Sequence, residues 1–269
     1  MPGDPEFRTD LYRGTATYYD EYRVSYPPEL LADVRLRTSV DGSSRVFDVA
    51  CGTGQIAFPL AEHVAEVWAV DQEPETVAFA RAKASRLDVR NIRWITGRAE
   101  DVAADRTFEL VTIGNAFHRL QRRVVAESAV RWLSPGGHLA LLWSGVPWLG
   151  TAEWHGVFAD VIWRWTRATG AADRIPPALE ETLSEASNTS VLASAGFTIV
   201  GRFDFWVAHE WSVESLAGFM YSTSFLSREA LGPQRQAFED DLRERLLAVE
   251  PRGIFCEDIS FSYELAQRP

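Results

Sequence analysis

The sequence has few cysteines and no long apolar run. Its 269 residues include two cysteines, Cys51 and Cys256, which is too few for a disulfide framework. No segment approaches the roughly 18 uninterrupted apolar residues of a membrane-spanning helix. The segment from Met1 to Asp10 is polar and lacks the apolar core of a signal peptide. These absences predict a cytoplasmic protein in a reducing compartment.

Positive charge is also scarce. Lys and Arg together number 27 against 38 Asp and Glu, so the formal net charge is −11. Because no run of Lys or Arg marks a basic groove, nucleic acid and anionic membranes are disfavoured as partners. The five histidines and two cysteines show no metal-ligand spacing, and we expect no metal site.

Hydrophobic residues make up 46% of the chain, enough for a large core. In the first half, short apolar runs alternate with segments of helical character. The predicted strands are 45–49, 67–70, 92–96, 108–113 and 138–143, and the predicted helices are 55–63, 74–86 and 122–132. This alternation indicates a parallel sheet covered by helices on both faces. Further strands are predicted at 197–206 and 259–266, with helices at 212–222 and 233–250.

The strongest motif is the glycine loop in Val46-Phe-Asp-Val-Ala-Cys-Gly-Thr-Gly54. Glycines between a strand and a helix let a ligand approach the backbone closely. The spacing also fits the dinucleotide fingerprint G-x-G-x-x-G/A, and Asp71 closes the next strand, where a ribose-binding acid is expected. A nucleotide-cofactor oxidoreductase is therefore one hypothesis. Asp48 argues against it, because a carboxylate before the glycines repels a pyrophosphate and suits a ligand with a positive amino group.

Six segments together resemble the class I S-adenosylmethionine-dependent methyltransferases, of the small-molecule type that includes trans-aconitate and ubiquinone-pathway enzymes. The segments are 18–27, 46–54, 69–71, 97–101, 108–118 and 133–139. The resemblance implies an α/β fold: a Rossmann-like doubly wound sheet of seven strands, mostly parallel with an antiparallel last strand, plus helical cap insertions. It implies S-adenosyl-L-methionine as the cofactor and methyl transfer to a small molecule as the activity. A non-catalytic binding protein on the same fold is a further alternative.

On this basis we expect a single methyltransferase domain over residues 1–269. A helical lid (1–44) precedes the cofactor-binding core (45–143). Two insertions cap the substrate (144–195 and 211–250), and the last strands follow at 196–210 and 258–267. The sequence does not indicate an oligomeric state.

The resemblance also implies cofactor-binding residues. They are Tyr18, Tyr19, Arg23, Asp48, Ala50, Gly52, Gly54, Asp71, Gln72, Ala99, Glu100 and Asn115. Ala50 stands where the first glycine of the loop is usual. Arg98 stands where an acid is common, so the adenine contact falls to Ala99, Glu100 or Asp101.

His118 follows the fourth strand and is the first candidate for a general base; the alternative is a histidine paired with a backbone carbonyl. Tyr221 is a second catalytic candidate. The candidate substrate residues lie in the aromatic insertion and are Trp148, Trp154, His155 and Trp163. The alternative is that these side chains pack a helix onto the core. A surplus of tryptophan suits an aromatic or heteroaromatic metabolite of specialised biosynthesis, and the net charge favours a neutral or cationic one. Methylation at carbon, nitrogen or oxygen is left open.

Overall fold

The computed structural model describes residues 11–175 and 186–269. The N-terminal segment in which we expect no signal peptide lies outside these residues. The strands are β1 (Arg45–Val49), β2 (Glu66–Asp71), β3 (Ile92–Thr96), β4 (Phe108–Gly114), β5 (Leu133–Ser144), β6 (Thr198–Trp211) and β7 (Phe255–Gln267). The α-helices are α1 (Ala16–Tyr22), α2 (Pro28–Thr38), α3 (Ala57–Ala61), α4 (Pro74–Arg86), α5 (Arg122–Trp132), α6 (Glu153–Ala168), α8 (Asn188–Ser194), α9 (Val213–Tyr221), α10 (Arg228–Leu231) and α11 (Arg235–Val249).

The strands form one seven-stranded sheet in the order β3-β2-β1-β4-β5-β7-β6. The first five strands are parallel, and β7 runs antiparallel to both of its neighbours. The predicted fold class is confirmed. The strand order reverses between β1 and β4, and in such sheets ligands bind beyond the carboxyl ends of the strands at that point.

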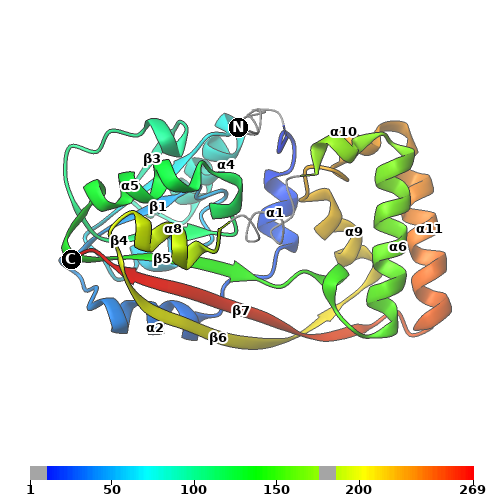
Figure 1. Ribbon diagram of the computed structural model, residues 1–269. Coiled ribbons are helices and arrows are strands. Elements are labelled where there is room, and N and C mark those ends of the chain that lie inside the picture. The colour runs from blue at the N-terminus through cyan, green and yellow to red at the C-terminus, as the bar shows by residue number, and fades with distance from the viewer. Residues whose placement is uncertain (1–10, 176–185) are drawn as a thin grey trace.

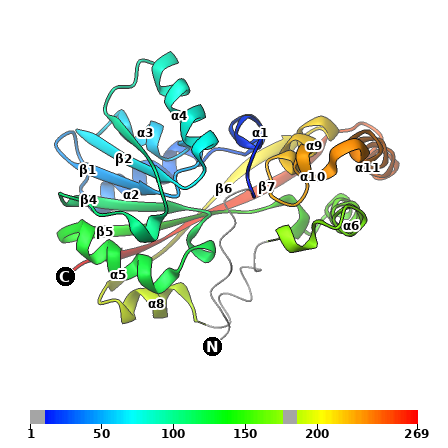
Figure 2. The same ribbon diagram turned by 90° about the horizontal axis from the view of Figure 1, so that it is seen from above.

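Helices cover both faces of the sheet (Figure 2). The apolar side chains of α5 and α8 pack against one face, around Phe47 and Val111. Those of α2 and α3 pack against the other face, around Val46 and Leu110. Val46 and Phe47 of β1 thus contribute to opposite clusters, which explains why adjacent residues of this strand are both apolar.

Beyond the sheet, β6 and β7 continue together as a long two-stranded ribbon that reaches α6, α9 and α11 (Figure 1). We call these three helices and α10 the cap. Helix α1 lies between the sheet and the cap and contacts both α4 and α9. Helix α8 falls within the predicted cap insertion 144–195 but covers the sheet beside α5 instead.

Local signals predicted some elements better than others. Helices α4 and α5 and strand β3 have the predicted bounds, and α4 begins with Pro at its first position, where no N–H is needed. Helix α3 is shorter than predicted, because the chain turns until Ile56. Strands β6 and β7 are longer than predicted, since each supplies the other's hydrogen-bond partners outside the sheet. Among the described helices, none has the length and apolarity needed to cross a bilayer.

The aromatic cluster below β1 generates a stability prediction. The Phe47 side chain is fully buried, and its ring centroid lies 5.1 Å from that of Phe108 and 5.0 Å from that of Trp132. Phe47→Ala is expected to lower the free energy of unfolding by about 3–5 kcal/mol, measured by urea denaturation. Leu36→Ala, at a position that is 79% exposed, serves as the control and is expected to change it by less than about 0.5 kcal/mol. Equal effects would contradict the assignment of Phe47 to the core.

Candidate functional site

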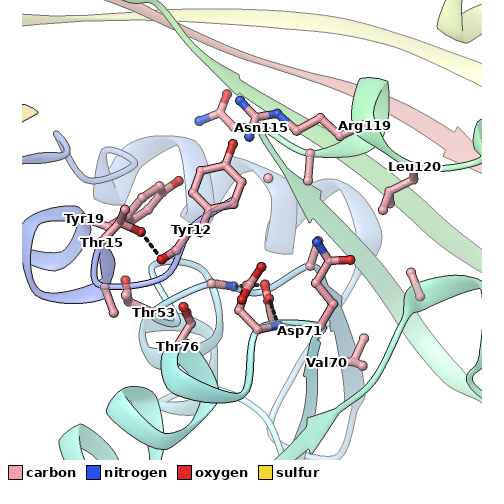
Figure 3. A pocket seen from close by; sticks show the side chains of 18 of the residues that line it. Tyr12, Thr15, Tyr19, Thr53, Val70, Asp71, Thr76, Asn115, Arg119 and Leu120 are labelled. Carbon is pink, nitrogen blue, oxygen red and sulfur yellow. Dashed lines mark hydrogen bonds between the residues drawn. The ribbon is translucent and has the colours of Figure 1, made fainter. Parts of the chain in front are cut away.

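A pocket that is open to solvent crosses the carboxyl ends of β3, β2, β1 and β4. The loops after these strands form its floor, and the segment leading into α1 lies over it (Figure 3). The lining residues that carry the argument are Tyr12, Thr53, Asp71, Gly97, Asn115 and Arg119. A smaller cavity adjoins it and shares Tyr19, Arg23 and Asn115 with it. We call the larger space the main pocket and the smaller one the side cavity.

Asp71, at the end of β2, joins two of the loops. One carboxylate oxygen accepts the Gly52 backbone N–H (2.9 Å), and the other accepts that of Glu73 (3.0 Å). Burial raises the pKa of Asp71, while these backbone N–H groups oppose the rise. Since a carboxylate oxygen accepts two hydrogen bonds, both oxygens can still receive hydroxyl groups from a ligand in the main pocket.

The loop after β1 turns through left-handed backbone conformations. Ala50 has φ 54° and Gly52 has φ 54°. A side chain on Gly52 or on Gly97 would meet no atom of the described protein within 4 Å, because both residues border the open pocket. By contrast, Gly54 lies beneath the loop, where an added Cβ would collide with the rings of Phe58 and Trp94.

Asp48 lies beneath the same loop and does not line the main pocket. It is 1% exposed and pairs in register with Thr112 of β4, whose hydroxyl donates to its Oδ1 (2.8 Å). Its Oδ2 is buried without a hydrogen-bond partner among the described residues. The pKa of Asp48 is raised to about 7, mainly by burial. The hydrogen bond from Thr112 opposes this rise, and the charge of the nearby Asp71 adds to it. The sequence predicts that Asp48 contacts the ligand directly. The structure instead places Asp48 below the pocket floor.

Asn115, just past β4, lines both spaces. Its φ of 51° is tolerated by asparagine more readily than by most residues. The side-chain amide donates to the Ser144 hydroxyl (2.8 Å) and accepts the Ser144 backbone N–H (2.9 Å). These bonds join the ends of β4 and β5 and fix the direction of the Asn115 side chain.

Arg23 follows α1 at the junction of the two spaces. Its guanidinium lies 4.3 Å from the centroid of the Phe219 ring and 5.2 Å from that of Tyr19, and its Nε donates to the Ser222 hydroxyl (2.7 Å). Burial lowers the pKa of Arg23. Among the described residues, no carboxylate pairs with this cation, and its two terminal nitrogens donate to no protein acceptor.

The structure brings most of the predicted cofactor residues together. Those lining the main pocket are Tyr19, Arg23, Ala50, Gly52, Asp71, Gln72, Ala99 and Asn115. Besides Asp48 and Gly54, two others lie elsewhere. Tyr18 accepts a hydrogen bond from Arg228, and Glu100 accepts the Gln121 backbone N–H (3.0 Å).

The two predicted catalytic side chains do not reach the pocket lining. The Nε2 atom of His118 accepts a hydrogen bond from Nε of Arg119 (3.2 Å). Burial, together with the charge of Arg122, lowers the pKa of His118 to about 4. An imidazole with its lone pair engaged and this low proton affinity is poorly suited to act as a base. Tyr221 donates to Glu239, and burial raises its pKa.

The predicted substrate residues Trp148, Trp154, His155 and Trp163 also line neither space. Trp148 and Trp163 pack against Phe225 inside the cap. Trp154 and His155 are buried, and His155 shares a hydrogen bond with Glu257 of β7 (3.0 Å). These four side chains therefore pack against other side chains, which is the alternative given in the sequence analysis. Helical periodicity alone does not distinguish a core face from a pocket wall.

Sequence reasoning missed the residues that complete the walls. Tyr12 and Arg119 line the main pocket, and Trp211, Phe219 and Phe261 line the side cavity. None of them belongs to a recognisable motif. The one available signal was position: Arg119 follows the fourth-strand motif directly. Among the described residues, there is no group of three or more His, Cys, Asp or Glu that could hold a metal ion.

This sheet and this pocket define a class of protein: a Rossmann-like domain with an open pocket at the carboxyl ends of its parallel strands, where such folds bind ligands. Comparison with known proteins makes the class specific. Residues 46–137 match a family model described as a methyltransferase domain. An uncharacterized methyltransferase of Mycobacterium tuberculosis is 32% identical over 127 residues, which are 47% of this chain and 49% of that protein. The chain thus spans about half the length of the mycobacterial relatives it matches.

Two longer similarities agree. An uncharacterized methyltransferase of Schizosaccharomyces pombe is 28% identical over 267 residues, covering 95% of this chain and 92% of that protein. The structure of a putative type II methyltransferase from Anaeromyxobacter dehalogenans shares the fold, with a TM-score of 0.60, 17% identity, and 91% and 97% of the two chains covered. These matches support the resemblance to class I S-adenosylmethionine-dependent methyltransferases that the sequence motifs indicate.

The left-handed conformation of Ala50 generates a prediction. Glycine adopts φ 54° without the steric cost that alanine incurs. Ala50→Gly is expected to raise the free energy of unfolding by up to about 1 kcal/mol. Ala32→Gly, in the exposed middle of α2, is the matched control and is expected to lower it by about 1 kcal/mol. Urea denaturation of both variants checks the opposite signs, and two losses of equal size would contradict the conformation of Ala50.

The buried carboxyl of Asp48 predicts a pH dependence of stability. Its folded pKa of about 7 exceeds the ordinary value of 3.8. At pH values between these two, Asp48 is ionised in the unfolded chain but protonated in the folded protein. The free energy of unfolding therefore falls as pH rises toward about 7. Relative to Asp48→Asn, which has no such ionisation, the wild type is expected to lose more than about 1 kcal/mol between pH 5 and pH 7. Denaturation curves at both pH values measure this, and parallel losses in the two proteins would show that Asp48 is already ionised at the lower pH.

Proposed function

We propose that the chain binds S-adenosyl-L-methionine in the main pocket and transfers its methyl group to a small molecule. The observation that carries the proposal is the continuity of the pocket across four strand ends, with Asp71 at its middle and Arg23 at one end. Two buried hydroxyls on its lining, those of Tyr12 and Thr53, have no hydrogen-bond partner among the described residues. Buried polar groups without partners favour a polar ligand in this space.

The residues present fit this cofactor part by part. Gly97 and Ala99, after β3, border the space suited to the adenine. The carboxylate of Asp71 suits the ribose hydroxyls. The methionyl part then reaches the ends of β1 and β4. There Arg23 offers its carboxylate two guanidinium nitrogens that have no acceptor among the described residues.

When bound, the cofactor would supply an electrophilic methyl group on a sulfonium: the acceptor forms a bond to the methyl carbon while the carbon–sulfur bond breaks, and the sulfur leaves as a thioether. The protein orients the two reactants and excludes water. The Ser144 hydrogen bonds hold Asn115 against the reacting end of the pocket. Because His118 has its lone pair engaged, we propose that the acceptor arrives as a nucleophile or loses its proton to water.

The aromatic side chains on the walls favour an aromatic or heteroaromatic acceptor. Tyr12 and Tyr19 line the main pocket, and Trp211, Phe219 and Phe261 line the side cavity. Aromatic side chains hold a planar molecule by stacking and by burial of apolar area. These walls replace the cap tryptophans as the support for this acceptor class.

The same fold also accommodates a nicotinamide dinucleotide, so the first experiment compares the two cofactors. Calorimetric titration of the wild type is expected to give micromolar binding of S-adenosylhomocysteine and none of the reduced dinucleotide. Binding of the dinucleotide alone would replace this proposal with an oxidoreductase, and binding of neither would favour a non-catalytic protein.

Gly97 offers a sharper test of the pocket. Its backbone is not left-handed, and an added Cβ would meet only open space. Gly97→Val is therefore expected to fold with nearly unchanged stability, yet to weaken S-adenosylhomocysteine binding more than about tenfold by filling the space for the adenine. Gly42→Val, in an equally open position away from the pocket, is the control and is expected to bind like the wild type. Wild-type affinity in a folded Gly97→Val protein would contradict this placement of the cofactor.

A further inference from the structure

We propose that the acceptor carries a carboxylate and that Arg119 binds it. The proposal rests on the proposed function and deepens it. Two guanidinium groups, those of Arg23 and Arg119, line the main pocket together with the acidic residues Asp71 and Glu73. S-adenosylmethionine has one carboxylate for these two guanidinium groups.

Neither arginine is neutralised within the described protein. No Asp or Glu lies within ion-pairing distance of Arg23 or Arg119 among the described residues. The Arg119 guanidinium donates from Nε to His118, and its terminal nitrogens have no protein acceptor there. These terminal nitrogens belong to a side chain that lines the pocket, and an anionic ligand there would give them an acceptor.

The positions of the two arginines assign them to different ligands. Arg23 lies deep, at the junction with the side cavity, between the rings of Tyr19 and Phe219. This is the methionyl end of the cofactor site proposed above. Arg119 is exposed through the pocket opening, on the same side as Asn115 and Tyr12 (Figure 3). An acceptor entering from solvent meets Arg119, whereas the cofactor carboxylate meets Arg23.

Neighbouring groups prepare Arg119 for an anion. Its guanidinium carbon lies 5.2 Å from the centroid of the Tyr12 ring, and the Tyr12 hydroxyl has no protein partner among the described residues. His118 holds Nε, which leaves the other edge of the guanidinium for a ligand. His118 is thus a positioning residue in this proposal. The planar fork of an arginine binds a carboxylate through two parallel hydrogen bonds, and the nearby hydroxyl supplies a third donor.

The test uses matched pairs of small molecules that differ in one charge. The protein, free and saturated with S-adenosylhomocysteine, is titrated with benzoate and benzamide, salicylate and salicylamide, and succinate and succinamide. In at least one pair the carboxylate is expected to bind the wild type about tenfold or more tightly than its amide. Arg119→Gln is expected to remove this preference. Arg123→Gln carries the same loss of charge at an exposed position outside the pocket and is expected to retain it.

The cofactor titration separates this inference from the proposed function. Arg119→Gln is expected to bind S-adenosylhomocysteine within about threefold of the wild type, while Arg23→Gln binds it about tenfold or more weakly. Failure of the wild type to bind S-adenosylhomocysteine would overturn the proposed function, whereas the pairwise preference for carboxylates is read independently in the free protein. The inference on Arg119 is overturned by any of three results: no carboxylate preferred over its amide up to about 10 mM, identical preferences in Arg119→Gln and Arg123→Gln, or a loss of cofactor affinity in Arg119→Gln as large as in Arg23→Gln.

Discussion

The geometry of the site depends on one half-buried carboxylate. Asp71 accepts backbone N–H groups from Gly52 and from Glu73, so a single side chain fixes the loop after β1 relative to the turn after β2. The Cys51 backbone N–H also donates to the Val70 carbonyl (3.0 Å), so the loop after β1 is held to β2 at a second point. The two carboxylate oxygens of Asp71 face the main pocket, so the group that shapes the floor is also available to a ligand. Folding and ligand recognition are therefore joined at this residue, and a substitution there changes both.

Much of the fold could be predicted because its signals are local. The proline that opens α4 and the buried strands that alternate with helices are visible in short stretches of sequence. The burial of Asp48 has a local signal too: it shares the β1 face of Val46, which is covered by α2 and α3. The length of the β6–β7 ribbon has no such signal, since each strand is stabilised by the other. The side-cavity wall formed by Trp211 and Phe219 depends in turn on that ribbon and on α9, so it could not be inferred from motifs.

Net charge and local charge lead to different conclusions about the acceptor. The chain carries 11 more negative than positive groups, which had favoured a neutral or cationic molecule. Interactions between charges separated by more than about 8 Å are largely screened at physiological ionic strength. A ligand in the main pocket is therefore governed by Arg23, Arg119 and Asp71 more than by the surface as a whole. The few charges on the wall of a pocket therefore indicate the charge of its ligand better than the net charge of the chain does.

Helix α1 has a kinetic consequence. It packs between α4 of the cofactor core and α9 of the cap, and its segment supplies Tyr19 and Arg23 to both spaces. A wall shared by two ligands imposes an order on their arrival. In the proposed arrangement the cofactor beneath the wall enters first and leaves last, and the acceptor enters and its product leaves in between. An enzyme built this way would hold its spent cofactor until the methylated product had gone.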